Sequence, residues 1–373
     1  MTRQLVVCLD GTGNRFSHKP TNVIRILRAL NADLNQVLPY YDQGVGTFGI
    51  KETLFEWQKV PSRIFGLAFG WGMSRTVESA YRFLAENYRE GDDLYLFGFS
   101  RGAYTVRALA ALVYACGLVQ PHQLNLFEYA WAMLLARDRK TKAPDFALQR
   151  HFKNTFGRSL SIKFLGLFDT VKSVGWVYDP TAIPYTAKNP IVKKVRHAQS
   201  IDERRCFFRQ NSWSDDPTQK TDVKQVWFAG VHSDIGGGYD PETSQLSSVA
   251  LCWMLGEAIA DGLDVDRTRC LSEMQLPEGL PPDLTADMHD SMTKGWKFAE
   301  WVPQYVWTSV DLKRHFHIGA MPPFGRPRSR VLPSHPAIHV SVKKRLDERP
   351  EYRPPNLQQP YDVVNDDTKS PCT

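Results

Sequence analysis

The 373-residue sequence has no long hydrophobic run. A transmembrane helix needs about 20 consecutive apolar residues, and no stretch of the chain approaches that length. The N-terminal MTRQLVVCLDGTGN has a short apolar run but no cleavage site, so it predicts a first β-strand rather than a Sec signal. We expect a chain that is cytoplasmic as synthesised, a location that still allows delivery by a specialised secretion system.

Cysteine is scarce and irregularly spaced. The six cysteines form no CxxC pair, which argues against a zinc ribbon and a disulfide scaffold. Cys8, Cys116 and Cys252 lie inside apolar segments. This pattern favours buried reduced thiols and a reducing compartment.

The excess of positive charge is small. Lys+Arg 46 against Asp+Glu 40 gives a net charge of +6, which is too diffuse to indicate a nucleic-acid-binding protein. Two basic segments, Lys193–Arg205 and Arg326–Arg330, are candidates for contact with anionic lipid headgroups. A solvated basic surface is the alternative. We expect no nucleic-acid partner, and the sequence identifies no protein partner.

Along the chain, short apolar segments alternate with segments whose apolar residues recur at helical spacing. The hydrophobic fraction of 42% can fill a large core. The apolar segments are Leu5–Leu9, Val37–Tyr41, Leu94–Phe97, Ile162–Phe168 and Val226–Val231. Strands of this kind separated by helices predict an α/β protein with a mainly parallel sheet flanked by helices.

The pattern predicts a single domain over residues 1–346. An aromatic, amphipathic stretch at about 120–157 predicts a helical insertion, either a lid over a lipid-sized cleft or an ordinary packed helix. The basic, aromatic segment Ile191–Trp213 is assigned no strand. Turn residues dominate an appended C-terminal region at about 263–346, and the Pro-rich residues 347–373 are predicted to be a loose tail.

The most informative stretch is LYLFGFSRGAYTVRALAAL. It contains G-x-S-x-G at Gly98, Ser100 and Gly102, between a strand pattern and a helix pattern. In such an elbow the serine has a strained backbone, and glycine neighbours avoid Cβ clashes. Ser100 is therefore a candidate nucleophile, and the N–H of Arg101, at the positive end of the following helix, is a candidate oxyanion donor. A tight turn with an incidental serine is the alternative.

A serine hydroxyl needs a base, and the base needs an orienting carboxylate. In the α/β-hydrolase architecture these residues follow in the order Ser, acid, His at the ends of later strands. IKFLGLFDTV contains Asp169 directly after an apolar run, and VWFAGVHSDIGGGY contains His232. The order Ser100, Asp169, His232 fits a catalytic triad.

Alternatives stay open for both partners. Asp169 can cap a helix, and His232 can be a structural histidine in a Gly-rich turn. Asp234 is a second candidate acid, and His289 or His339 can supply the imidazole.

The loop DGTGN after the first strand is expected to supply a second oxyanion donor, from Thr12 or Gly11. A plain turn is the alternative. The motif is also similar to D-x-D-G-T phosphatases, but Cys8 occupies the position of their nucleophilic aspartate. No G-x-G-x-x-G spacing follows a strand, so no dinucleotide site is predicted.

Six motifs in order carry a family resemblance: VCLDGTGN, YYDQGVGT, LFGFSRGAYTVRALA, GLFDTV, VRHAQSIDERR and VWFAGVHSDIGGGY. Together they resemble an uncharacterised bacterial and fungal α/β-hydrolase domain family that includes the catalytic domains of type VI secretion phospholipase effectors. The similarity runs from Arg3 to about Ala260, and SHPAIHVSV resembles a further family element. It implies Ser100 as nucleophile, Asp169 as acid, His232 as base, and hydrolysis of phospholipid acyl esters.

The sequence thus predicts a serine hydrolase that cleaves lipid or phospholipid acyl esters through an acyl-enzyme. This chemistry needs no cofactor, and no metal-ligand spacing is evident. Peripheral contact with a membrane fits such a substrate. Two other functions stay open: a soluble carboxylesterase acting on small acyl esters, and a non-catalytic hydrolase-like binding module that would lack a triad member.

Overall fold

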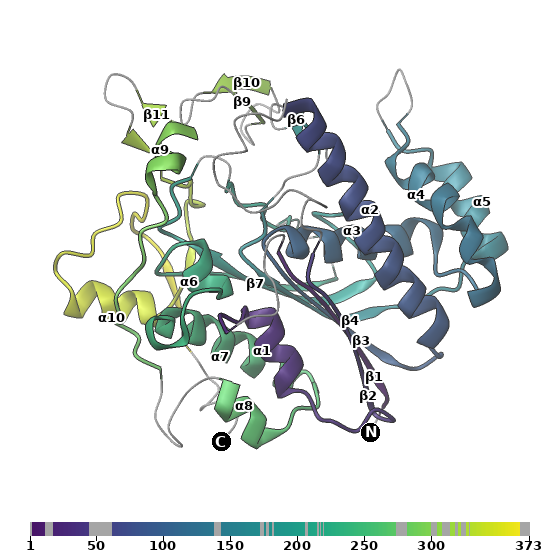
Figure 1. Ribbon diagram of the computed structural model, residues 1–373, viewed down its shortest axis with the longest axis horizontal. Helices are drawn as coiled ribbons and strands as arrows, with labels where there is room; N and C mark the ends of the chain where they lie inside the picture. Colours follow the sequence, from purple (N-terminus) through teal and green to yellow (C-terminus); the bar gives the residue numbers. More distant parts are fainter. Residues whose placement is uncertain are drawn as a thin grey trace.

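A computed structural model describes residues 2–11, 18–44, 62–137, 143–171, 175–176, 179–180, 183–205, 208–214, 216, 218, 220–273, 282–299, 304–307, 314–317, 320–321, 326–327 and 329–365. At its centre is an eight-stranded sheet in the order β14-β13-β8-β7-β4-β3-β1-β2. Every pairing in this sheet is parallel. Helices flank the sheet (Figure 1), which confirms the predicted α/β-hydrolase-like architecture.

The sheet strands, from one edge to the other, are β14 (Asp362–Val364), β13 (Ala337–His339), β8 (Asp222–Phe228), β7 (Val192–Ser200), β4 (Ile162–Phe168), β3 (Asp93–Phe99), β1 (Gln4–Leu9) and β2 (Val37–Asp42). Three two-stranded antiparallel ribbons pair β5 (Gly175–Trp176) with β6 (Asp179–Pro180), β9 (Gln304–Trp307) with β10 (Arg314–His317), and β11 (Ala320–Met321) with β12 (Arg326–Pro327).

Two helical layers cover the sheet. One contains α2 (Ser62–Asn87), α3 (Arg101–Cys116), η2 (Pro121–Leu126), α4 (Phe127–Leu135) and α5 (Phe146–Phe156). The other contains α1 (Asn22–Ala29), α7 (Gln245–Ala260) and α8 (Arg267–Glu273). The remaining helices are α6 (His232–Gly236), η3 (Pro241–Thr243), α9 (Lys294–Ala299) and α10 (Val340–Glu348). None of the described helices has the length and apolar character needed to cross a bilayer.

The strand pleat divides the core between these two layers. In β1, Leu5, Val7 and Leu9 join the cluster with α2 and α3, whereas Val6 and Cys8 join the cluster with α1 and α7. Successive side chains of a strand point to opposite faces, so a strand covered on both faces must be apolar throughout. This explains why the core strands appear in the sequence as continuous apolar runs.

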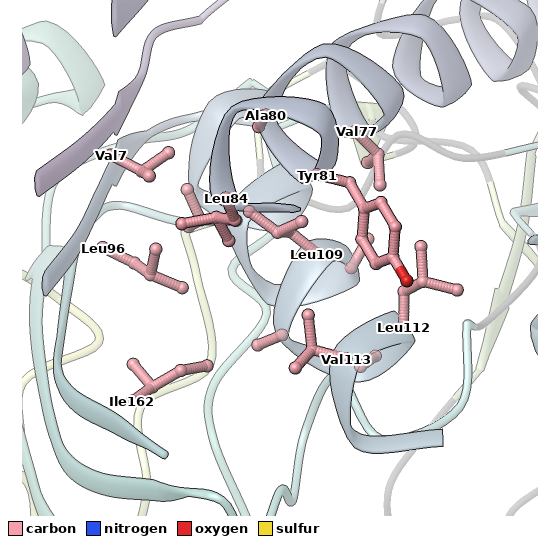
Figure 2. Close-up of a cluster of buried hydrophobic side chains, with 14 of the residues drawn as sticks. Val7, Val77, Ala80, Tyr81, Leu84, Leu96, Leu109, Leu112, Val113 and Ile162 are labelled. Carbon is pink, nitrogen blue, oxygen red and sulfur yellow. The ribbon is translucent and has the colours of Figure 1, made fainter. Parts of the chain in front are cut away.

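Figure 2 shows the larger cluster at close range. Val7, Leu96 and Ile162, from three neighbouring strands, face Tyr81 of α2 and Leu109 of α3. All five side chains are almost fully buried. This packing fixes α3, and therefore the residue that precedes it, against the centre of the sheet.

The strand β7 was not predicted, although it lies between β4 and β8. Its basic residues hide the apolar pattern: Lys194 pairs with Asp261, and the buried Arg196 pairs with Asp222 and Glu257. Buried cations are tolerated because these carboxylates neutralise them. Lys194 and Arg196 of the basic segment 193–205 are thus paired with carboxylates of the same chain.

The predicted helical insertion corresponds to η2, α4 and α5. Phe127 and Trp131 of α4 are buried in the core, whereas Tyr129 between them is exposed. This alternation is typical of an amphipathic helix packed on a domain. The contacts favour the packed-helix alternative over a lid.

The structure differs from the predicted loose tail over residues 347–365. β14 pairs with β13 and forms the edge of the sheet. Tyr352 is buried, and its hydroxyl donates to Asp202 at 3.0 Å. A three-residue strand between prolines has no periodic pattern of its own, so the sequence did not indicate it.

The cysteines also differ in part from prediction. Cys8, Cys116 and Cys252 are buried thiols, but Cys270 is disulfide-bonded, and its partner lies outside the described residues. The expectation of reduced cysteines is therefore wrong for Cys270. Spacing along the chain does not show which cysteines meet in the fold.

Gly102, the second residue of α3, packs against the end of β1. A Cβ atom here would lie 2.2 Å from the carbonyl oxygen of Leu9 and 2.5 Å from that of Asp10. Since these backbone atoms belong to the sheet edge, we expect Gly102→Ala to lower the free energy of unfolding by about 2 kcal/mol or more. Urea unfolding followed by circular dichroism measures this loss.

Gly91→Ala is the matched control. Gly91 has a φ of +94° but nothing within 4 Å of its missing Cβ, so its replacement adds only left-handed backbone strain, about 1 kcal/mol. Equal losses in the two variants would contradict the close packing of Gly102.

Candidate active site

Ser100 forms the turn between β3 and α3. Its φ of 59° and ψ of −122° form a conformation that side-chain-bearing residues rarely adopt. A Cβ on Gly98 would lie 2.6 Å from the Cα of Ala103, so the strand turns directly into the helix only with glycine at this position. The Ser100 N–H donates to the Phe168 carbonyl at 3.0 Å, which ties the turn to β4.

Ser100, His232 and Asp169 meet at the carboxyl edge of the sheet. The Ser100 Oγ lies 2.8 Å from His232 Nε2, and His232 Nδ1 lies 2.6 Å from Asp169 Oδ2. Asp169 directly follows β4, and His232 opens α6 four residues after β8. All three residues are buried. Together they form a continuous hydrogen-bonded chain from hydroxyl to carboxylate.

The Asp169 carboxylate is surrounded by donors. Oδ1 accepts from the Ser200 N–H at 3.0 Å and from Arg330 Nη1 at 2.5 Å, and Oδ2 accepts from Arg330 Nη2 at 2.9 Å. Burial alone would raise the pKa of Asp169, but the Arg330 guanidinium and the hydrogen bond from His232 hold it well below its ordinary value. The carboxylate is therefore ionised.

His232 is held as a neutral imidazole. Burial lowers its pKa below the ordinary value of 6.5, and the hydrogen bond with Asp169 opposes this only in part. Because an ionised carboxylate can only accept, the ring proton lies on Nδ1. This leaves Nε2 free to accept the Ser100 hydroxyl proton, the tautomer that a general base requires.

Two phenylalanines flank the imidazole. The ring centroid of Phe99 lies 4.6 Å from that of His232, and Phe208 meets it edge-on at 4.9 Å. Phe99 also fills the space beside Gly236, where a Cβ would lie 1.9 Å from its ring. These contacts fix the plane of the imidazole.

A second ion pair, between Glu203 and Arg205, also contacts His232. Glu203 accepts from the His232 backbone N–H at 3.2 Å and from the Arg205 guanidinium at 2.8 and 2.9 Å. Burial would raise the pKa of Glu203, but Arg205 lowers it to about 2. The Arg205 guanidinium in turn lies 3.6 Å from the centroid of Phe208. The segment after β7 thus holds both the backbone and the ring of His232.

Asp234 and His289, two of the alternative residues, pair with each other. His289 Nδ1 lies 2.7 Å from Asp234 Oδ1, and its ring stacks on Tyr239 at 3.7 Å. The other oxygen of Asp234 accepts from the Val231 N–H at 3.0 Å, at the start of α6. Asp169, not Asp234, is the carboxylate that His232 contacts.

His339, the third alternative, is buried beside α10. Its Nδ1 lies 2.8 Å from the Ser341 Oγ, and its ring stacks on Phe228. The structure thus brings Ser100 together with His232 rather than with this histidine. Within the described ranges, no three His, Cys, Asp or Glu side chains form a metal-binding group.

The candidate oxyanion donors have different surroundings. Arg101 is the first residue of the 16-residue helix α3, so its N–H lies at the positive end of that helix. The Gly11 N–H donates to Asp10 Oδ1 at 2.7 Å, and Asp10 also accepts from the Thr21 hydroxyl at 2.5 Å. Thr12 lies outside the described residues.

Two residues of the site, Arg330 and Glu203, are not identified by the sequence patterns. Arg330 was noted only within the basic segment Arg326–Arg330, a candidate for headgroup contact, but it is buried against Asp169. A single arginine in a turn-rich region has no pattern that reveals its partner. Glu203 did have a signal, because it lies in the VRHAQSIDERR motif that follows the acid.

Residues 3–257 match the family described as "T6SS, Phospholipase effector Tle1-like, catalytic domain". This range contains Ser100, Asp169 and His232 and ends before Arg330.

Individual proteins are similar to parts of the chain. "Uncharacterized protein YEL023C" of Saccharomyces cerevisiae is 32% identical over 220 residues, 56% of this chain and 32% of the yeast protein. Among solved structures, an uncharacterized protein from Pseudomonas aeruginosa is 20% identical with a TM-score of 0.41 and covers 71% of this chain and 46% of that one. The Tle1 effector bound to the VgrG spike from the type 6 secretion system is 21% identical with a TM-score of 0.38, covering 66% and 52%. The chain spans about a third of the yeast relative's length and about half of each solved chain.

The environment of His232 predicts the acidic limb of the pH profile. A histidine whose pKa lies below 6.5 is still mainly neutral at pH 6.5, so it can still accept the proton from Ser100. We expect kcat/KM for a chromogenic ester to reach half its plateau at a pH below 6.5. A half-maximum at or above 6.5 would contradict this environment.

The contacts also predict which histidine is needed. His232→Ala should lower kcat by at least about 10³-fold, because it removes the group that contacts the Ser100 hydroxyl. His289→Gln should keep most of the turnover, since His289 pairs with Asp234 instead. Steady-state kinetics on the same ester compare the two. Full turnover in His232→Ala would assign the base elsewhere.

Proposed function

Because the chain belongs to the Tle1-like family of type VI secretion phospholipase effector catalytic domains, we propose that it is a serine esterase acting on lipid or phospholipid acyl esters. The observation that carries the proposal is the chain of contacts from Ser100 through His232 to Asp169, at 2.8 and 2.6 Å. Family membership supports the lipid ester as the substrate class, and these contacts support serine chemistry. Delivery by a secretion system is part of the same proposal.

The proposed reaction begins with attack of the Ser100 Oγ on the ester carbonyl. His232 Nε2 takes the hydroxyl proton, and Asp169 holds the Nδ1–H and stabilises the imidazolium that forms. His232 then gives the proton to the departing alcohol, which leaves an acyl-enzyme on Ser100. A water molecule then transfers a proton to His232 and attacks the acyl carbon. The bond between this carbon and the Ser100 Oγ breaks, His232 returns the proton to Ser100, and the carboxylic acid is released.

Stabilisation of the oxyanion is assigned to two backbone amides. The Arg101 N–H follows the nucleophile directly, and the second donor comes from Gly11 or Thr12. Gly11 would first have to turn from Asp10, to which its N–H donates in this structure. Each donor contributes about 3 kcal/mol of transition-state stabilisation in comparable sites.

Two other functions make different predictions for the same residues. A non-catalytic binding module predicts a missing triad member, whereas all three are present and in contact. A soluble carboxylesterase would use the same triad on small acyl esters, so only the substrate separates it from a lipase.

Labelling with a fluorophosphonate probe tests the nucleophile. We expect wild type to be labelled and Ser100→Ala to be unlabelled, because the probe reacts only with a serine activated by a base. Ser79→Ala, which changes an exposed serine of α2, is the matched control and should label as wild type does. A wild type that stays unlabelled under conditions that label a known esterase would overturn the proposal.

An ester panel tests the substrate class. We expect hydrolysis of phospholipid vesicles and of long-chain esters to exceed that of short-chain esters in kcat/KM. Activity confined to short-chain esters would favour the carboxylesterase instead.

A further inference from the structure

Arg330 lies beyond the region that matches the family, yet it contacts the candidate acid. Its guanidinium is buried and makes five hydrogen bonds. Two go to the oxygens of Asp169, two to the Phe208 carbonyl and one to the Ser200 carbonyl. A buried arginine with this many acceptors is held in a single position.

Contacts made by Tyr352 and Asn356 of the C-terminal segment hold Arg330 in this position. The Asn356 amide donates to the carbonyl oxygens of Arg330 and Ile201, at 3.1 and 3.0 Å. Tyr352 and Asp202 join the same two segments through a hydrogen bond of 3.0 Å. The backbone around Arg330 is therefore fixed to the end of β7, next to the catalytic residues.

We propose that Arg330 is a positioning residue of the active site, which orients the Asp169 carboxylate toward His232 and offsets its negative charge. The proposal rests on the serine-esterase function proposed above. It adds a residue from outside the family region to the catalytic machinery.

The orienting role follows from the hydrogen bonds of Asp169. With Arg330 present, each carboxylate oxygen has two donors: Ser200 and Arg330 on Oδ1, His232 and Arg330 on Oδ2. The two-pronged guanidinium defines the plane of the carboxylate. Without Arg330, each oxygen keeps one donor, and nothing else among these contacts holds that plane.

The electrostatic role follows from the charges around His232. Asp169 and Glu203 are negative, while Arg205 and Arg330 are positive, so the two ion pairs balance.

Three more titratable groups lie close by. His197, behind Asp169, stays neutral because burial and the nearby Arg107 lower its pKa to about 3. Asp234 follows His232 on α6, and it is paired with His289. A carboxylate balanced by a cation raises the proton affinity of its histidine less than an isolated one does. His232 therefore stays neutral, and able to act as a base, in mildly acidic solution.

Two variants separate the two roles. Arg330→Met removes the positive charge, so we expect the half-maximum of kcat/KM to move up by about one pH unit, a tenfold change in proton affinity. Arg330→Lys keeps the charge but loses the second guanidinium nitrogen that donates to Asp169. We therefore expect the half-maximum to stay near wild type while the plateau of kcat/KM falls at least tenfold. Arg349→Met, which breaks a partly exposed ion pair with Asp287 in the same C-terminal region, should change neither quantity.

Titration of the His232 ring by NMR gives a second readout that needs no turnover. We expect the same upward shift in Arg330→Met as in the kinetics. If Arg330→Met does not fold, the kinetics of Arg330→Lys decide: a plateau within twofold of wild type overturns the proposal. Folded variants with an unmoved half-maximum and a plateau within twofold of wild type overturn it as well.

The proposed function and this inference can fail separately. If wild type neither labels nor hydrolyses esters, the esterase function fails, while the NMR titration still shows whether Arg330 sets the proton affinity of His232. If wild type is active but neither the ring titration nor the kcat/KM plateau changes in the Arg330 variants, only the role of Arg330 fails.

Discussion

The buried carboxylate of Asp169 is the constraint around which the carboxyl edge of the sheet is organised. A charge removed from water is tolerated only when partners replace its hydration. Those partners come from widely separated parts of the chain: Ser200 at the end of β7, His232 at the start of α6, and Arg330 from the C-terminal region. Closing this small network therefore requires β4, β7 and β8 to be in register and the C-terminal segment to be docked. The candidate catalytic residues come into contact only when the tertiary fold is complete, and the buried carboxylate within that fold is tolerated only when these contacts form.

The same principle explains the positions of two arginines in the basic segment of the sequence. Arg196 of β7 is buried and pairs with Asp222 and Glu257, and Arg205 pairs with Glu203. These cations form ion pairs with carboxylates of the same chain, so a basic stretch of sequence need not form a basic surface. The net charge of +6 thus gives little information about which molecules or surfaces the protein binds.

Local patterns made part of this structure predictable. Continuous apolar runs indicated β1, β3, β4 and β8, and the G-x-S-x-G spacing placed Ser100 in its turn, because both depend on neighbouring residues. Features that depend on distant contacts were not predictable: the charged strand β7, the edge strand β14, the disulfide of Cys270 and the burial of Arg330 on Asp169. Motif order suggested Asp169 and His232, but only the fold places His289 on Asp234 and away from Ser100. Glu203 could have been identified from its motif, whereas nothing in the sequence around Arg330 indicates a buried ion pair.

The separation of 161 residues between Asp169 and Arg330 has a consequence for biosynthesis. A ribosome that has reached residue 257 has already made the whole region that matches the family, including the serine, the histidine and the carboxylate. The cation that balances this carboxylate has not yet been translated. On the role proposed for Arg330, a nascent chain holds an incomplete catalytic centre until the segment that contains Arg330 emerges and docks. Translation order would then delay the proposed esterase activity until this docking is complete.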